Sequence, residues 1–149
     1  MNIASTQYNS SDRAFEIYLS GCDGFCGDDC HNKELWDYKL GDPWRVDLPY
    51  IISKIDRFSN LIDSIWVLGG EPLLHDDIYM FLRVLSGLGK KIYLFTRFDF
   101  EEIDKEILSM VDFIKCGHYN RDKVEEDYYS KGIKLATSNQ AVYEKGVDY

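Results

Sequence analysis

The chain has 149 residues and a formal charge of −9, from 26 acidic and 17 basic side chains. A chain of this length is predicted to form one domain, residues 1–149, and its 45% of hydrophobic residues indicate a globular protein rather than a disordered one. The negative charge argues against a nucleic-acid partner and against binding to an anionic membrane surface.

The location of the protein follows from its N-terminus and its apolar runs. The first fifteen residues lack a basic segment followed by an apolar run, so no signal peptide is predicted, and no apolar stretch reaches the length of a membrane span. We therefore expect a cytoplasmic protein. Clustered cysteines in that compartment indicate metal or redox chemistry rather than structural disulfides.

The predicted strands are short apolar runs separated by glycines, charged residues and helical patterns. The second run, "SIWVL", ends in two glycines, as a strand buried on both faces often does. The five predicted strands are residues 14–19, 64–68, 91–95, 112–116 and 132–137.

Three helices are predicted between these strands. The first begins at Asp47 as N-cap, with Pro49 in its first turn, and carries an apolar stripe as far as residue 58. The second begins after the aspartates at 76–77 and ends at the glycines 87 and 89. The third begins with a capping-box pattern at residues 99–102.

Strands that alternate with helices predict a parallel sheet with helical crossovers. Four or five such units are too few for a closed eight-stranded barrel, so we expect an α/β fold that is an open, partial (β/α) barrel of mainly parallel strands. Ligands of such sheets bind at the carboxyl ends of the strands. The unusual segments after strands one to four, which we expect to form one site, are residues 21–37, 69–75, 96–98 and 117–119.

The segment "GCDGFCGDDCHNKELWD" holds Cys22, Cys26 and Cys30, three of the four cysteines. Three thiolates so close in sequence can converge on one metal ion or cluster, and a set of three leaves one metal position open for a substrate or cofactor. The alternative is a closed structural zinc site, with His31 or the distant Cys116 as the fourth ligand.

The same segment resembles the cluster loop of the radical S-adenosylmethionine (radical SAM) enzymes, and in particular that of the activases of glycyl radical enzymes. Their loop typically reads C-x3-C-x2-C followed by H-N or Y-N and then a tryptophan. This chain has three residues in the second step, and Asp29 stands where many radical SAM enzymes have an aromatic residue.

Three further segments extend the resemblance over most of the chain, from about residue 14 to about residue 142. "LGGEPLL" resembles the G-G-E-P motif of the family. "LFTRFDFEEI" resembles the T-G-Y-x-x-E-E-L stretch of the activases of anaerobic ribonucleotide reductase, with Arg97 in place of the glycine. "ATSNQAV" resembles their S-S-N-Q segment.

The resemblance implies a minimal radical SAM core and an iron–sulfur enzyme. Cys22, Cys26 and Cys30 would hold a 4Fe-4S cluster, and S-adenosylmethionine would bind its open iron. Reductive cleavage of S-adenosylmethionine would then produce a 5′-deoxyadenosyl radical that installs a glycyl radical. The implied partners are the large subunit of anaerobic ribonucleotide reductase and an electron donor such as flavodoxin.

The predicted cofactor-binding residues come from the three other motifs. Glycine carbonyls in G-G-E-P suit a bound ammonium group, and the glutamate can accept a charge-assisted hydrogen bond or orient the loop. The threonine that ends the third strand is a candidate for the carboxylate or ribose of the cofactor. Ordinary structural roles remain open for all of them. The predicted residues are Gly69, Gly70, Glu71, Pro72, Thr96 and Asn139.

The sequence is therefore compatible with three functions. The first is an activase of anaerobic ribonucleotide reductase. The second keeps the radical chemistry but acts on another glycyl radical enzyme or on a small molecule. The third is a zinc-stabilised interaction domain without catalysis. The shifted third cysteine favours it, but the G-G-E-P and S-N-Q segments have no use in such a domain and favour the radical chemistry.

Overall fold

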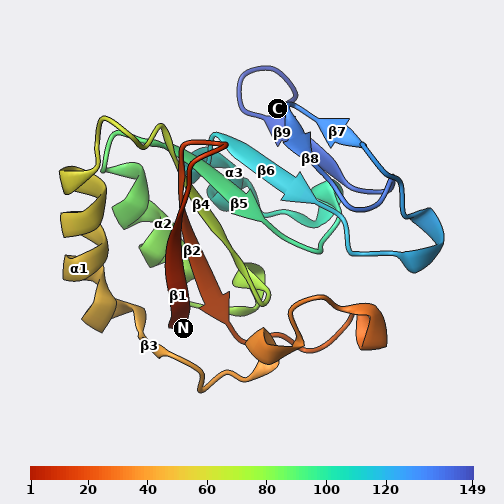
Figure 1. Cartoon of the computed structure of the whole chain (residues 1–149), viewed down its shortest axis with the longest axis horizontal. Helices are drawn as coiled ribbons and strands as arrows, with labels where there is room; N and C mark the ends of the chain where they lie inside the picture. Colours follow the sequence, from red (N-terminus) through yellow and green to blue (C-terminus); the bar gives the residue numbers. More distant parts are fainter.

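The fold is built on one large mixed sheet, described here from a computed structural model that covers all 149 residues. Its strands are β1 (Asn2–Asn9), β2 (Ala14–Ser20), β3 (Asp42–Pro43), β4 (Ser64–Gly69), β5 (Lys91–Phe95), β6 (Phe113–Cys116) and β9 (Ala141–Glu144). They lie in the order β3-β1-β2-β4-β5-β6-β9 (Figure 1). The central strands β2, β4, β5 and β6 are parallel, while β1, β3 and β9 pair antiparallel at the two sides.

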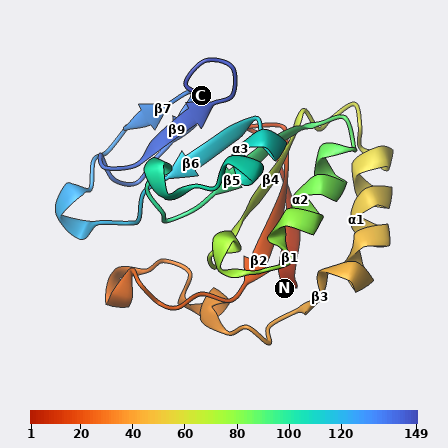
Figure 2. The same ribbon diagram turned by 180° about the vertical axis from the view of Figure 1, so that it is seen from behind.

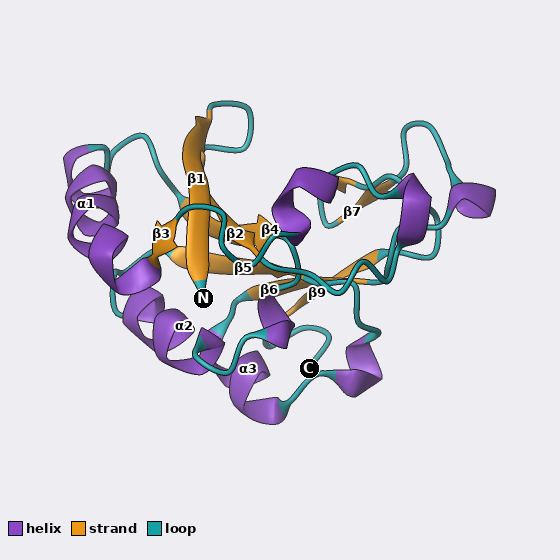
Figure 3. Ribbon diagram, turned by 90° about the horizontal axis from the view of Figure 1, so that it is seen from below, coloured by secondary structure: helices purple, strands orange, loops and turns teal.

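Three helices cover one face of this sheet: α1 (Trp44–Arg57), α2 (Ile78–Ser86) and α3 (Lys105–Met110). Figure 3 shows them along one side, with β7 (Tyr129–Ser130) on the other. The helix-side core contains alternate residues of the parallel strands, for example Ile17, Val67 and Leu94, which are fully buried. Every second residue of a strand points to the opposite face, where a smaller core surrounds Trp66 and Phe113.

The four predicted strands of the parallel sheet are confirmed, but the fifth is wrong. Within residues 132–137 only β8 (Ile133–Lys134) forms, and it pairs with β7 in a separate two-stranded hairpin. The strand that completes the large sheet is β9, which lies beside β6 at the end opposite to α1 (Figure 2). Pattern reasoning missed β1 and β9 because each buries only part of its residues and neither reads as a continuous apolar run.

Two helix starts also differ from the prediction. Helix α1 begins at Trp44 rather than at Asp47, because the Trp44 ring is buried and its Nε1 donates to Asp77 Oδ2 at 2.6 Å. Pro49 therefore lies inside the helix. The capping box at 99–102 is present, but it caps a separate 3-10 turn, because Asp104 starts α3 by accepting a hydrogen bond from Glu106 N.

No helix of the structure combines the length and the apolar character that crossing a bilayer requires. The residues of interest lie in the loops at the carboxyl ends of the parallel strands. In Figure 1 these are the orange segment after β2 and the light-blue segment after β6.

Candidate functional site

One cavity of about 240 Å³ opens at the carboxyl ends of the parallel strands. Its lining brings together the loops that the sequence places at this edge. The residues that line it include Cys22, Cys26, Cys30, Gly69, Gly70, Glu71, Thr96, Arg97, Lys115 and Gln140. Segments that are far apart in the sequence therefore meet at one place, as expected from the direction of the strands.

The cysteine loop accommodates the longer second step as one short turn. Residues Gly27–Asp29 form a 3-10 turn between the second and third cysteines. Gly27 has φ +62°, which favours glycine, and its amide donates to Gly24 O at 2.8 Å. All three cysteines are half-buried, without disulfides, and line the cavity. The C-x3-C-x3-C spacing is thus compatible with three thiols that face one space.

The acidic side chains within this turn are neutralised away from the cavity. Asp28 pairs with Lys33 at 3.1 Å, and its side chain is fully exposed. Asp29 pairs with Arg121 at 3.4 Å. Because each carboxylate has a cationic partner and contact with solvent, the two contribute little net field at the thiols.

Burial raises the pKa of the Cys22 and Cys26 thiols, although a hydrogen bond from the backbone of Tyr119 opposes the shift at Cys26. Both groups are therefore protonated at neutral pH when no metal is bound. A metal must displace these protons, because only the thiolate is a good ligand.

The two glycines at the end of β4, Gly69 and Gly70, allow the following turn to pack against the base of the cysteine loop. A Cβ atom at Gly70 would lie 2.3 Å from Gly21 O, and one at Gly69 would lie 2.3 Å from Leu19 O. Backbone hydrogen bonds hold the contact, from Gly70 N to Leu19 O at 2.8 Å and from Glu71 N to Gly21 O at 2.9 Å. The carbonyl of Gly70 accepts no hydrogen bond from the chain, and Gly70 is one of the residues that line the cavity.

Glu71 is a buried carboxylate that joins two of the loops. Its Oε1 accepts from Leu73 N at 3.0 Å and from Thr96 Oγ1 at 2.8 Å, and its Oε2 accepts from Arg97 N at 2.8 Å. Burial raises its pKa, and these donors act in the opposite direction. Of the two roles that the motif allows, the contacts show the second: Glu71 orients the turn and the end of β5.

Arg97 fastens the end of β5 to the cysteine loop, a contact that motif reasoning did not find. Its Nη2 donates to Asp23 Oδ2 at 2.7 Å, and its guanidinium lies 4.4 Å from the Phe25 ring and 4.3 Å from the Phe98 ring. Its buried Nε has no partner. The one signal in the sequence was that arginine replaces the glycine of the similar motif.

Lys115 is the second residue that sequence reasoning missed. It reaches the cavity from β6, its Nζ donates to Gly117 O at 2.6 Å, and burial lowers its pKa to about 8. A lysine inside the otherwise apolar run "DFIKC" was the available signal, because a lysine on a buried strand usually has a specific partner.

Two predicted cofactor residues lie outside the cavity lining. Pro72 is buried at the start of the 3-10 turn Pro72–Leu74, directly after Glu71. Asn139 donates through Nδ2 to His118 O at 2.9 Å, so it positions the loop after β6. Its neighbour Gln140 lines the cavity instead and donates to Gly117 O at 3.2 Å.

The geometry disfavours the two fourth ligands considered for a closed zinc site. Cys116 belongs to the helix-side core, whereas its neighbour Lys115 faces the cavity, so the thiol points to the opposite side of the sheet. His31 lines the cavity, and its ring packs on Tyr119, with 4.5 Å between ring centroids. No three His, Cys, Asp or Glu side chains lie close enough together to hold a single ion.

The donor set fits an iron–sulfur cluster better than a single ion. A cluster distributes its cysteine ligands over separate iron atoms, so the sulfurs need not converge on one point. Three thiols around a cavity with Leu68 and Phe95 in its wall provide soft ligands and a partly apolar surround.

Comparison with models of protein families identifies a match. Residues 13–143 match the model of a family described as the 4Fe-4S single cluster domain, which includes all three cysteines of the loop and every cavity residue named above. No curated protein matches the chain.

Proposed function

The chain belongs to the 4Fe-4S single cluster domain family, and on that premise we propose that it is a radical SAM enzyme of the glycyl-radical-activase type. Cys22, Cys26 and Cys30 are its cluster ligands in this proposal. The parallel strands with α1 to α3 are then a minimal, partial-barrel radical SAM core. The proposed reaction installs a glycyl radical on the large subunit of an anaerobic ribonucleotide reductase.

The observation that carries the proposal is the shared wall of the three thiols and the Gly69–Glu71 turn. Three cysteine ligands leave one iron of a cubane open, and Gly70, whose carbonyl has no partner in the chain, lines the same cavity. A backbone carbonyl is a suitable acceptor for the ammonium group of S-adenosylmethionine. The half-buried Lys115 in the same wall is a cation that a carboxylate can approach.

A cluster held by Cys22, Cys26 and Cys30 would supply the electron for reductive cleavage of S-adenosylmethionine, and so the radical chemistry that removes a hydrogen atom from a glycine of the partner. The chain has to bind, orient and exclude water. Glu71 holds the turn after β4 against the end of β5. Arg97 and Asp23 hold the cysteine loop over the cavity. Leu68, Phe95 and Ala136 provide apolar wall, which limits the access of water.

Two parts of the proposal rest on the sequence resemblance alone. They are the choice of anaerobic ribonucleotide reductase over another glycyl radical enzyme or a small molecule, and the use of an electron donor such as flavodoxin. The structure is equally compatible with the same radical chemistry on either kind of substrate.

The test is anaerobic reconstitution with iron and sulfide, followed by reduction with dithionite in the presence of S-adenosylmethionine. We expect a brown protein with about four irons per chain that releases 5′-deoxyadenosine. Cys30→Ala should lose the cluster, whereas the matched control Cys116→Ala, which alters a core thiol, should retain it. A colourless protein with one tightly held zinc ion per chain would refute the proposal.

The partner is tested separately. The loaded protein is mixed with the large subunit of an anaerobic ribonucleotide reductase, and the glycyl radical is measured by electron paramagnetic resonance. Cleavage of S-adenosylmethionine without a radical on this subunit would reject this partner and leave the iron–sulfur chemistry in place.

A further inference from the structure

The outer edge of β1 has no partner over most of its length. Strand β3 pairs only with Asn2 and Ile3, and the backbone of residues 5–9 bonds to no segment other than β2. Five residues of strand extend about 17 Å. A row of free amide and carbonyl groups of this length is a template for an added strand.

Natural edge strands are usually protected by charged residues, proline or a covering segment. The sequence of β1, "NIASTQYN", contains neither charge nor proline, and its one irregularity lies at Ala4, before the free part. The opposite edge of the same sheet is closed. On β9, Val142 N donates to Ser130 Oγ at 2.9 Å, and Glu144 pairs with Lys131 at 3.6 Å. The β1 edge alone is left open and uncharged.

A second cavity, also of about 240 Å³, runs along this open edge between β1 and α1. It is lined by Thr6, Gln7 and Tyr8 in succession, although the Gln7 side chain points to the other face, where it donates to Glu16. Because side chains alternate along a strand, the cavity must reach the backbone edge at Gln7. We call this cavity, lined by Thr6–Tyr8, Phe15, Tyr50, Lys54, Phe58, Leu61 and Ile62, the edge groove.

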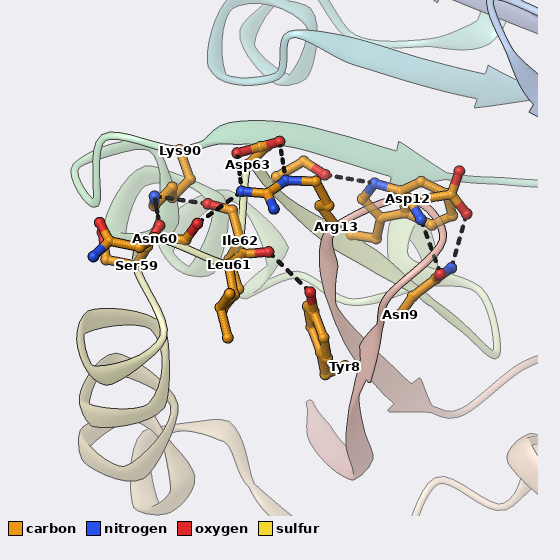
Figure 4. Close-up of polar contacts among 12 residues, drawn as sticks. Tyr8, Asn9, Asp12, Arg13, Ser59, Asn60, Leu61, Ile62, Asp63 and Lys90 are labelled. Atoms are coloured by element: carbon orange, nitrogen blue, oxygen red, sulfur yellow. Dashed lines mark hydrogen bonds and ion pairs between the residues drawn. The ribbon is translucent and has the colours of Figure 1, made fainter.

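The walls of the edge groove are exposed aromatic and aliphatic side chains. Tyr8 is 46% exposed, Tyr50 55% and Leu61 48%. Figure 4 shows Tyr8 beside Leu61, with its hydroxyl donating to Leu61 O at 3.1 Å, so that the strand and the loop after α1 form one wall. Arg13, which bonds to Asp63 and to Asn60 O, holds the same loop in place. The groove is therefore a preformed surface.

One cation lies in the groove of this acidic protein. Lys54 Nζ is 5.2 Å from the Tyr50 ring centroid and 5.7 Å from that of Phe58, and it forms no ion pair. No carboxylate of the chain pairs with Lys54, so a ligand that places a carboxylate here can form an ion pair with it. The free segment of β1 contains no acidic residue, so a second copy that pairs edge to edge through β1 would bring no carboxylate to Lys54.

We propose that the β1 edge and the edge groove bind an extended peptide segment of a partner protein as an additional strand. The segment places an aromatic or aliphatic side chain between Tyr8 and Tyr50 and a carboxylate beside Lys54. Backbone hydrogen bonds to residues 5–9 supply affinity, and side chains at alternate positions supply selectivity. This surface uses none of the residues of the cysteine cavity, so the proposal stands apart from the proposed radical chemistry.

The probe is a fluorescein-labelled synthetic peptide of alternating threonine and valine, with one phenylalanine and a glutamate two positions later. Binding to the full chain is measured by fluorescence anisotropy, and hydrogen–deuterium exchange identifies the segment involved. We expect slower exchange over residues 5–9. A peptide with the same side chains and N-methylated backbone amides should not bind, because it has lost its donors for the edge.

Charge reversal tests the side-chain part of the proposal. Lys54→Glu should weaken the glutamate peptide about fivefold, as expected for an exposed ion pair replaced by a like-charge pair, and a peptide with lysine in place of glutamate should recover the loss. Lys105→Glu, an exposed lysine on α3 without an ion pair, is the matched control and should change nothing.

Three results would overturn the proposal. One is equal binding of the N-methylated peptide, which would show apolar adsorption rather than strand pairing. Another is unchanged exchange at residues 5–9 under saturation. The third is a dimer in sedimentation experiments that protects the same amides without peptide, which would identify the occupant as a second copy of the chain.

Discussion

Replacing Glu71 with alanine removes the acceptor on which three donors from two loops converge. The donors are the amides of Leu73 and Arg97 and the hydroxyl of Thr96, all at 2.8 to 3.0 Å. A hydrogen bond to a charged acceptor contributes about 1.5–3 kcal/mol to stability. Two effects reduce the sum: the buried carboxylate carries a desolvation cost, seen in its raised pKa, and the adjacent cavity lets water reach the freed donors. We expect a loss of about 3 kcal/mol.

The assay is urea unfolding of the metal-free chain, with the iron content of the reconstituted chain as a second measurement. Glu101→Ala, which alters an exposed carboxylate in the neighbouring 3-10 turn, is the control and should stay within about 0.5 kcal/mol. Thr96→Val, which removes one of the three donors, should cost about 1 kcal/mol. A loss below about 1 kcal/mol for Glu71→Ala would contradict the view that this carboxylate holds the turn.

Three further predictions concern the same region. Gly70→Ala, whose Cβ would lie 2.3 Å from Gly21 O, should cost about 2 kcal/mol in urea unfolding, whereas Gly87→Ala, at φ −74° with its nearest contact at 3.4 Å, should be neutral or slightly stabilising. Burial lowers the pKa of His75, so the folded state binds fewer protons than the unfolded state. The free energy of unfolding should therefore fall as pH drops below about 6.5. His75→Gln should remove this pH dependence, and an unchanged dependence in the variant would contradict the assignment to His75. Arg97→Ala should speed hydrogen exchange in the cysteine loop. Arg97→Lys should not restore the protection, because the contacts with both aromatic rings and with Asp23 use the plane of the guanidinium.

The local pattern of the chain was enough to locate the parallel strands and the loops that follow them. Runs such as "SIWVL" and "KIYLF" are continuous and apolar because strands buried on both faces tolerate little else. Once their parallel direction is inferred, the meeting of the cysteine loop with Gly69–Glu71 and Thr96 follows, since all three segments leave the same edge.

Other features depend on partners far away in the sequence. Helix α1 begins at Trp44 because that ring bonds to Asp77, and no local signal predicts this contact. Cys116 resembles a ligand in the sequence, but the alternation of β6 directs it to the helix side and places Lys115 in the cavity. Arg97 replaces the glycine of the similar motif, and only its contacts with Asp23 and Phe25 show what the arginine does.

The residue pattern is enough to indicate iron–sulfur chemistry: three soft donors lie on a glycine-containing loop, at the end of a buried strand, in a chain whose family match extends over residues 13–143. Which residues complete the site, and which surface stays open, is fixed by the packing of the whole chain. Both depend on pairing between distant segments, and the free edge of β1 is the clearest case. An edge is defined by the absence of a neighbouring strand, which only the arrangement of the whole sheet reveals.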